Sequence, residues 1–182
     1  DEPASKTHIC AIVNAAVLEY KLGREETAID SLRDAAKKMR VSDPKDWFDK
    51  QDYHLNKANI LSDLAGMLYG RLIGGRGREE EIKEALSCWE DALKNASGYE
   101  NSPEGKRALL KCYYYLGVFR MSQSDYPQAK GYFKQALNID NSRLDIKLRL
   151  AIVCVDNADI GEAKKILKDN EKQFDRLLED IE

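Results

Sequence analysis

Apolar positions recur at helical spacing along nearly the whole of this 182-residue chain. From Thr7 to Arg40, and again beyond Tyr53, apolar residues return every three or four positions, which is typical of amphipathic helices that bury one face. Short breaks separate these helices, such as the glycine at Gly23, a residue that commonly ends a helix. The pattern therefore predicts an all-α protein made of helical hairpins.

The clearest hairpin runs from Lys111 to Asn141, and its packing positions stand at fixed offsets. Ala129 follows Gly117 by twelve residues, Phe133 follows by four more, and Ala136 by three more. A small residue on each helix lets the two backbones approach closely, and a large aromatic side chain fills the remaining space. We therefore expect Gly117 to lie where the two helices nearly touch, with Phe133 filling the hairpin.

The same offsets recur in both directions along the chain. Ala28 follows Ala16 by twelve residues, and Ala151 follows Gly117 by 34. This spacing resembles the tetratricopeptide repeat, whose period is about 34 residues. The resemblance implies a right-handed α-α superhelix, a solenoid of about eight antiparallel helices. It divides residues 1–182, as a single domain, into hairpins at about 7–41, 53–95, 103–141 and 142–182. Because the chain starts at Asp1 without a methionine, we expect it to be a fragment of a longer protein.

The second hairpin departs from the regular spacing. Two packing registers fit its first helix. The first packs through Leu61, Leu64, Ala65 and Leu68, and the second is shifted by one residue and packs through Gly66. Five glycines between Gly66 and Gly77 interrupt the helical pattern, which resumes at Glu79. The segment from Gly70 to Arg78 is either a mobile connector or a contact for phosphate or an acidic partner, made by Arg71, Arg76 and Arg78.

Two short motifs predict local structure between the hairpins. Ser42, Asp43 and Pro44 form a helix-start signal, and the Trp47-Phe48 pair after them predicts a short helical turn. Ser142 followed by Asp145 predicts a capping box at the start of the fourth hairpin.

Composition narrows the possible functions. The net charge of −3 argues against a duplex-binding domain that works by bulk positive charge. No apolar run approaches the length of about 18 residues that spans a bilayer, so no membrane partner is expected. The four cysteines are isolated, and we predict reduced, mostly buried thiols in a cytoplasmic or nuclear protein; they are Cys10, Cys88, Cys112 and Cys154.

The sequence shows no recognisable set of catalytic residues. It has only two histidines, and its cysteines lack the spacing of a metal site. Neither a nucleophile-elbow motif nor a phosphate-binding P-loop motif occurs. We therefore predict a protein that is not an enzyme, with no catalytic residues, no metal and no cofactor.

The resemblance also implies a binding surface. In the tetratricopeptide family, the first helix of each hairpin lines a concave groove. The repeat offsets place eight mainly apolar residues there: Val13, Val17, Tyr20, Tyr114, Val118, Met121, Leu148 and Ile152. Such a lining suits an amphipathic helix or an extended apolar peptide. The alternative left open is that the protein's own C-terminal helix, from Gly161 to Ile181, covers this face.

Family members that act as chaperone adaptors present lysine, arginine and asparagine in the groove to clamp a C-terminal carboxylate. The matching positions here carry none of these residue types; they are Val13, Val17, Ser62, Gly66, Tyr114 and Val118. We therefore expect no heat-shock-protein binding by such a clamp. The expected function is a non-catalytic protein-interaction scaffold within a multiprotein complex. The alternative is an RNA-contacting subunit of a ribonucleoprotein that uses the arginine-containing segment.

Overall fold

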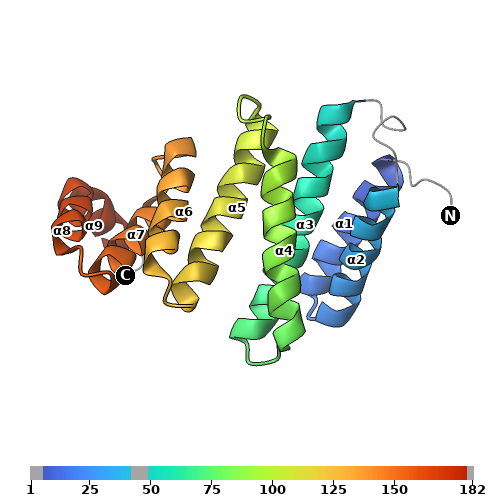
Figure 1. Cartoon of the computed structure of the whole chain (residues 1–182), viewed down its shortest axis with the longest axis horizontal. Helices are drawn as coiled ribbons and strands as arrows, with labels where there is room; N and C mark the ends of the chain where they lie inside the picture. The colour runs from blue at the N-terminus through green and yellow to red at the C-terminus, as the bar shows by residue number, and fades with distance from the viewer. Residues whose placement is uncertain (1–5, 42–48, 180–182) are drawn as a thin grey trace. The chain divides into compact units, whose positions relative to one another are not determined.

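The computed structural model describes residues 6–41 and 49–179, with side chains described for residues 7–39 and 49–175. The predicted helix-start signal at Ser42 and the turn at Trp47-Phe48 lie outside these residues. The described part forms nine helices and no strand (Figure 1). They are α1 (Lys6–Lys21), α2 (Glu25–Val41), α3 (Lys50–Ile73), α4 (Glu79–Ala96), α5 (Pro103–Ser122), α6 (Tyr126–Ile139), α7 (Leu144–Asp156), α8 (Ile160–Asp169) and α9 (Glu171–Glu179). The prediction of an all-α fold is confirmed for these residues.

The contacts divide the chain into two compact units, Asp1–Ala108 and Leu109–Glu182, with the boundary inside α5. We call them the N-terminal unit and the C-terminal unit. The N-terminal unit holds α1 to α4 and the first turns of α5. The C-terminal unit holds the rest of α5 and α6 to α9.

In the N-terminal unit, α2 packs on α1 and on α3, and α3 packs along α4 (Figure 1). The core contains the small residues Ala16 and Ala28 beside large ones such as Leu32 and Trp89, all fully buried. Polar contacts fix the neighbouring helices. The Tyr53 hydroxyl donates to the Met39 carbonyl at 2.5 Å. The Arg33 guanidinium donates to both oxygens of Glu84 at 2.9 and 2.7 Å, which ties α2 to α4.

The structure decides between the two registers of α3. Gly66 is only half-buried. The four positions of the first register are all at most 2% exposed: Leu61, Leu64, Ala65 and Leu68. The second hairpin therefore packs through Ala65.

The glycine-containing segment is shorter as a loop than the sequence predicted. Helix α3 continues through Gly70 to Ile73, so only the residues from Gly74 to Arg78 lie outside helices. Gly70 lies inside the helix at a close contact with α1, because a Cβ there would lie 2.6 Å from the Tyr20 hydroxyl. Gly77 likewise lies against the last helical turn, where its Cβ would come within 2.7 Å of the Leu72 backbone. The segment is therefore helical up to Ile73 and leaves the helix only from Gly74 to Arg78, so it is not rigid helix throughout.

The core of the C-terminal unit matches the predicted hairpin. Phe133 is fully buried, and a Cβ at Gly117 would lie 2.7 Å from its ring, so α5 and α6 meet where the sequence predicted. The same cluster includes residues of α7 and α8, among them Ile146, Leu150 and Ala163. Where α7 begins, the predicted capping box is not formed. Ser142 and Asp145 bind different partners, since Ser142 donates to Asp140 and the Asp145 carboxylate accepts from Arg143.

Candidate functional site

The predicted groove residues of the C-terminal unit fall into two groups. Tyr114, Val118 and Met121 of α5 are partly buried and pack against the core cluster. Leu148 and Ile152 of α7 are exposed, at 44% and 40% of their surface. A charge at Val118 would therefore disturb the core as well as any surface. Only the two α7 residues present a clearly solvent-facing apolar surface.

A third exposed aliphatic residue extends this surface along α7. Val155 is 50% exposed and stands three residues after Ile152. Residues separated by four and then three positions lie on one face of a helix. Leu148, Ile152 and Val155 therefore form one row, which we call the α7 row. The repeat offsets that gave Leu148 and Ile152 missed Val155, although it stands at helical spacing from Ile152.

Two arginines lie over the ring of Tyr114, beside the α7 row. The Arg149 guanidinium is 5.5 Å from the ring centroid, and that of Arg143 is 6.0 Å away. Arg143 also forms a bidentate pair with Asp145 at 2.8 and 2.6 Å, and this contact lowers the pKa of the Asp145 carboxyl. Among the described residues, no carboxylate pairs with Arg149. Arg149 is therefore a positively charged side chain, without an acidic partner in the described part of the chain, at the side of the α7 row. It was not identified from the sequence.

The predicted groove residues of the N-terminal unit are Val13, Val17 and Tyr20 on α1, and all three are half-buried. The most exposed aliphatic residues here are instead Leu18 of α1, at 58%, and Leu22 just after the helix, at 60%. Spacing alone placed Val13 and Val17 on one helical face, but it could not show how much of that face the neighbouring helices cover.

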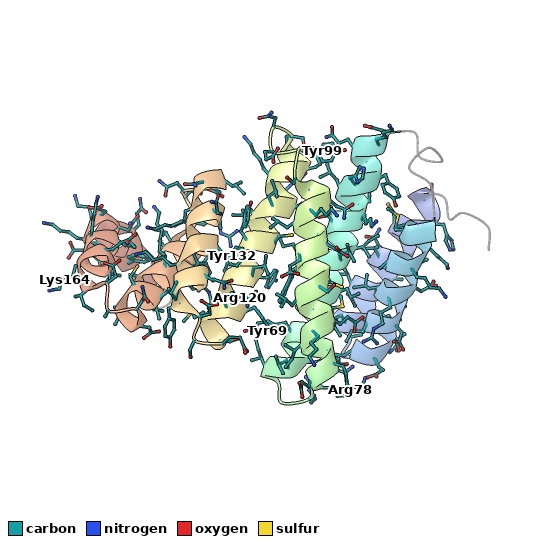
Figure 2. The ribbon with its side chains drawn as sticks, viewed as in Figure 1. Tyr69, Arg78, Tyr99, Arg120, Tyr132 and Lys164 are labelled. Atoms are coloured by element: carbon teal, nitrogen blue, oxygen red, sulfur yellow. The ribbon has the colours of Figure 1, made fainter. Side chains whose placement is uncertain are left out.

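The three arginines of the glycine-containing segment are engaged by glutamates of the same unit. Arg71 binds Glu26 at 2.9 Å, Arg76 binds Glu25 at 2.9 Å, and Arg78 binds Glu81 at 3.3 Å; Arg78 stands at the turn before α4 (Figure 2). Burial by itself raises the pKa of Glu81, but hydrogen bonds from Arg78 and the charge of Arg71 lower it overall. These ion pairs hold the segment against α2 and α4.

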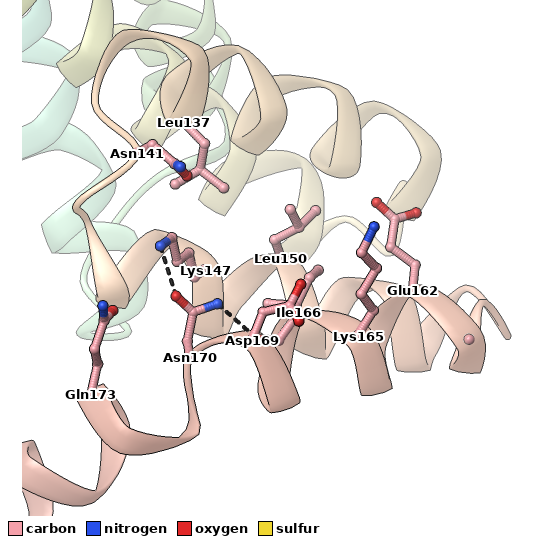
Figure 3. Close-up of a pocket in the computed structure, with 11 residues that line it drawn as sticks. Leu137, Asn141, Lys147, Leu150, Glu162, Lys165, Ile166, Asp169, Asn170 and Gln173 are labelled. Carbon is pink, nitrogen blue, oxygen red and sulfur yellow. Dashed lines mark hydrogen bonds between the residues drawn. The ribbon is translucent and has the colours of Figure 1, made fainter.

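A pocket of about 700 Å³ opens between the end of α6 and helices α7, α8 and α9 (Figure 3). Its floor includes Leu150 and Ile166, and its rim is polar. Within it, the Lys147 ammonium donates to the Asn170 side-chain oxygen at 2.7 Å. The Asn170 amide nitrogen in turn donates to the Ile166 carbonyl at 2.8 Å, where α8 ends. No sequence motif indicated this pocket, because four separate helices contribute to it.

One group of potential metal ligands exists among the described residues: the Cys154 thiol with the Asp159 and Glu162 carboxylates. The Lys130 ammonium contacts both carboxylates, and Lys134 adds a contact to Glu162 at 2.8 Å. Burial raises the pKa of the Cys154 thiol, which disfavours the thiolate that a metal would need. Lys130 and Lys134 already supply the positive charge that these carboxylates need, so the cluster is an ion-pair network between α6 and α8.

This network predicts an acid-dependent part of the stability. Hydrogen bonds from Lys130 lower the pKa of both Asp159 and Glu162. A carboxylate with a lowered folded-state pKa stabilises the protein above its unfolded pKa of about 4, and loses this effect as the pH falls through the folded value. Lys130→Met should therefore lower the urea midpoint at neutral pH, and its difference from wild type should shrink near pH 3. A difference that stays constant with pH would contradict this assignment; Lys164→Met, at an exposed position on α8, is the control.

All four cysteines are free, three of them buried and Cys10 half-buried, as the sequence predicted. Among the described helices, none is long and apolar enough to cross a membrane.

With this geometry established, comparisons with known proteins identify the repeat. The family model of the tetratricopeptide repeat matches residues 120–175, from the end of α5 into α9. The resemblance to the tetratricopeptide repeat is confirmed. This matched segment contains the whole α7 row and Arg149.

Solved structures extend the likeness in fold beyond that segment. The crystal structure of BtubC (BKLC) from P. vanneervenii is similar over 93% of this chain, with a TM-score of 0.69 and 16% sequence identity. The match spans 64% of the length of that chain. The MamA protein is more distant, with a TM-score of 0.47 and 14% identity over 92% of this chain and 94% of that one. The pilF protein of Pseudomonas aeruginosa is more distant still, with a TM-score of 0.37 and 17% identity over 88% of this chain and 73% of that one. No curated protein matches the sequence.

Proposed function

We propose that this protein is a non-catalytic interaction scaffold that holds an apolar or amphipathic segment of a partner protein. The observation that carries the proposal is the α7 row, in which Leu148, Ile152 and Val155 are each 40% to 50% exposed on one helical face. A contiguous apolar surface is typical of a surface that a partner covers. The half-buried Tyr114 beside it adds an aromatic ring to the same surface. In this proposal the binding surface belongs to the C-terminal unit, and the protein acts in the cytoplasm or nucleus.

The RNA-binding alternative has no observation in its favour. The arginines on which it depends already bind Glu25, Glu26 and Glu81. A phosphate backbone would have to compete with these carboxylates. We therefore retain the protein partner as the proposed function.

Affinity capture with matched variants tests the proposal. The wild-type chain and the double variant Leu148→Glu/Ile152→Glu serve as baits, with Leu167→Glu/Ile160→Glu as a control of the same composition on α8, where Leu167 and Ile160 are 42% and 45% exposed. We expect proteins that wild type and control retain to be lost from the α7 double variant. Retention of the same proteins by all three baits would overturn the proposal.

Salt dependence separates this function from RNA binding. Apolar contact changes little with salt, whereas nucleic-acid binding weakens by orders of magnitude between about 50 and about 200 mM salt. We expect capture to persist across this range and to survive nuclease treatment.

A further inference from the structure

The occupant of the α7 row can be specified further from the charges at its flanks, an inference that rests on the proposed function. The row runs over eight residues, from Leu148 to Val155, on a single helix. A ridge of side chains at this spacing packs into the groove of a second helix, whose own apolar residues repeat in the same way. A helix lying along α7 would bring its polar flanks next to the charged residues that border the row.

The first of these charged residues is Arg149. It follows Leu148 directly, and its guanidinium rests on the Tyr114 ring at 5.5 Å, a contact that restricts where the charge can lie. The nearby Arg143 forms a bidentate pair with Asp145, but Arg149 has no carboxylate partner among the described side chains. A positioned guanidinium without an acidic partner is suited to a carboxylate that arrives from outside.

The second charged residue is Asp156, which follows Val155 and is exposed. It is the last residue of α7, where a carboxylate faces the negative end of the helix dipole and is unfavourable for the helix. It has no ion pair within the described part of the chain. A basic residue from a partner would remove this unfavourable interaction.

We propose that the α7 row binds an amphipathic helix of a partner protein that carries an acidic residue against Arg149 and a basic residue against Asp156. Arg149 and Asp156 are seven residues apart, which is about 10 Å along a helix. The partner's two charges therefore lie on one side of its apolar stripe, about two turns apart. The charges select the partner, and the apolar row supplies most of the affinity.

Selection from a peptide library tests this pairing. The probe is a displayed library of helical peptides with a fixed leucine stripe, in which the flanking positions vary among glutamate, lysine and glutamine. On the wild-type chain, we expect enrichment of peptides with glutamate on one flank and lysine about seven residues away. Arg149→Glu should replace the selected glutamate by lysine, and Asp156→Lys should replace the selected lysine by glutamate. Lys164→Glu, at an exposed lysine on α8 that points outward in Figure 2, should leave both preferences unchanged.

Binding of a single selected peptide gives the size of the effect. Arg149→Glu should weaken it about fivefold at low salt, and exchanging the peptide's glutamate for lysine should restore the loss. Enriched peptides without charge preference, or with preferences that Arg149→Glu does not change, would overturn the pairing while leaving the scaffold function intact. If the leucine-stripe library is not enriched over a glutamine-stripe library, or if Ile152→Glu and the control Ile160→Glu bind equally, the apolar docking itself is wrong, and the proposed function fails with it.

Discussion

Gly117→Leu is expected to destabilise the protein by about 3 kcal/mol, because the position has no room for a side chain. A Cβ there would lie 2.7, 2.8 and 3.0 Å from three carbons of the Phe133 ring. Phe133 is fully buried in the same core cluster as Ala129 and Ala136, so displacing its ring would disturb that cluster. Urea unfolding monitored by circular dichroism measures the change, and Gly117→Ala should show a smaller loss in the same direction.

A second helical glycine in the same hairpin provides the matched control. Gly131 lies in the interior of α6 and is exposed, and a Cβ there would meet no atom within 4 Å. Gly131→Ala should therefore stabilise the protein by up to about 1 kcal/mol, because alanine favours the helix over glycine. If Gly117→Leu unfolded at the wild-type urea concentration, the close approach of α5 and α6 at Gly117 would be wrong.

The helices and the main packing contacts could be predicted from the sequence because they depend on local periodicity and on repeat offsets. The spacing from Gly117 to Phe133 identified a contact between two helices without any structural information. For the glycine-containing segment, the interruption before Glu79 could be predicted, but the role of each glycine could not. Gly70 lies inside α3 with the Tyr20 hydroxyl of another helix close by, and a sequence pattern does not distinguish a glycine that allows close packing from one that breaks a helix.

The candidate surface could be predicted only in part. The repeat offsets of the family resemblance placed Leu148 and Ile152 together, and the structure shows both exposed. Periodicity could not reveal that Val118 packs against the core cluster, because burial depends on which neighbouring helix covers each face. The role of Arg149 was also hidden, since its importance comes from a contact with Tyr114, 35 positions earlier in the chain.

Gly105→Ala is expected to destabilise the N-terminal unit by about 3 kcal/mol, because the start of α5 is folded tightly against the preceding loop. A Cβ at Gly105 would lie 1.9 Å from the Tyr99 carbonyl oxygen, which is backbone and cannot rotate aside as a side chain could. That carbonyl also accepts hydrogen bonds from the Ser102 backbone and hydroxyl, each at 3.0 Å. The Ser102 hydroxyl in turn accepts from the Gly105 N–H at 3.0 Å, which caps the helix. Moving the Tyr99 carbonyl therefore disturbs the cap and the loop together.

Gly161→Ala is the control for this substitution, since Gly161 also lies in the first turn of a helix but has no atom within 4 Å of its missing Cβ. It should leave the urea midpoint unchanged or raise it slightly. Ser102→Ala should cost about 1 kcal/mol through loss of the cap. Because Gly105→Ala already displaces the carbonyl that orients Ser102, the double variant should lose less than the sum of the two single losses. If the stability losses of Gly105→Ala and Ser102→Ala were additive, the loop would have adapted to a Cβ at Gly105 without losing the Ser102 cap. The tight connection between α4 and α5 would then not contribute to stability.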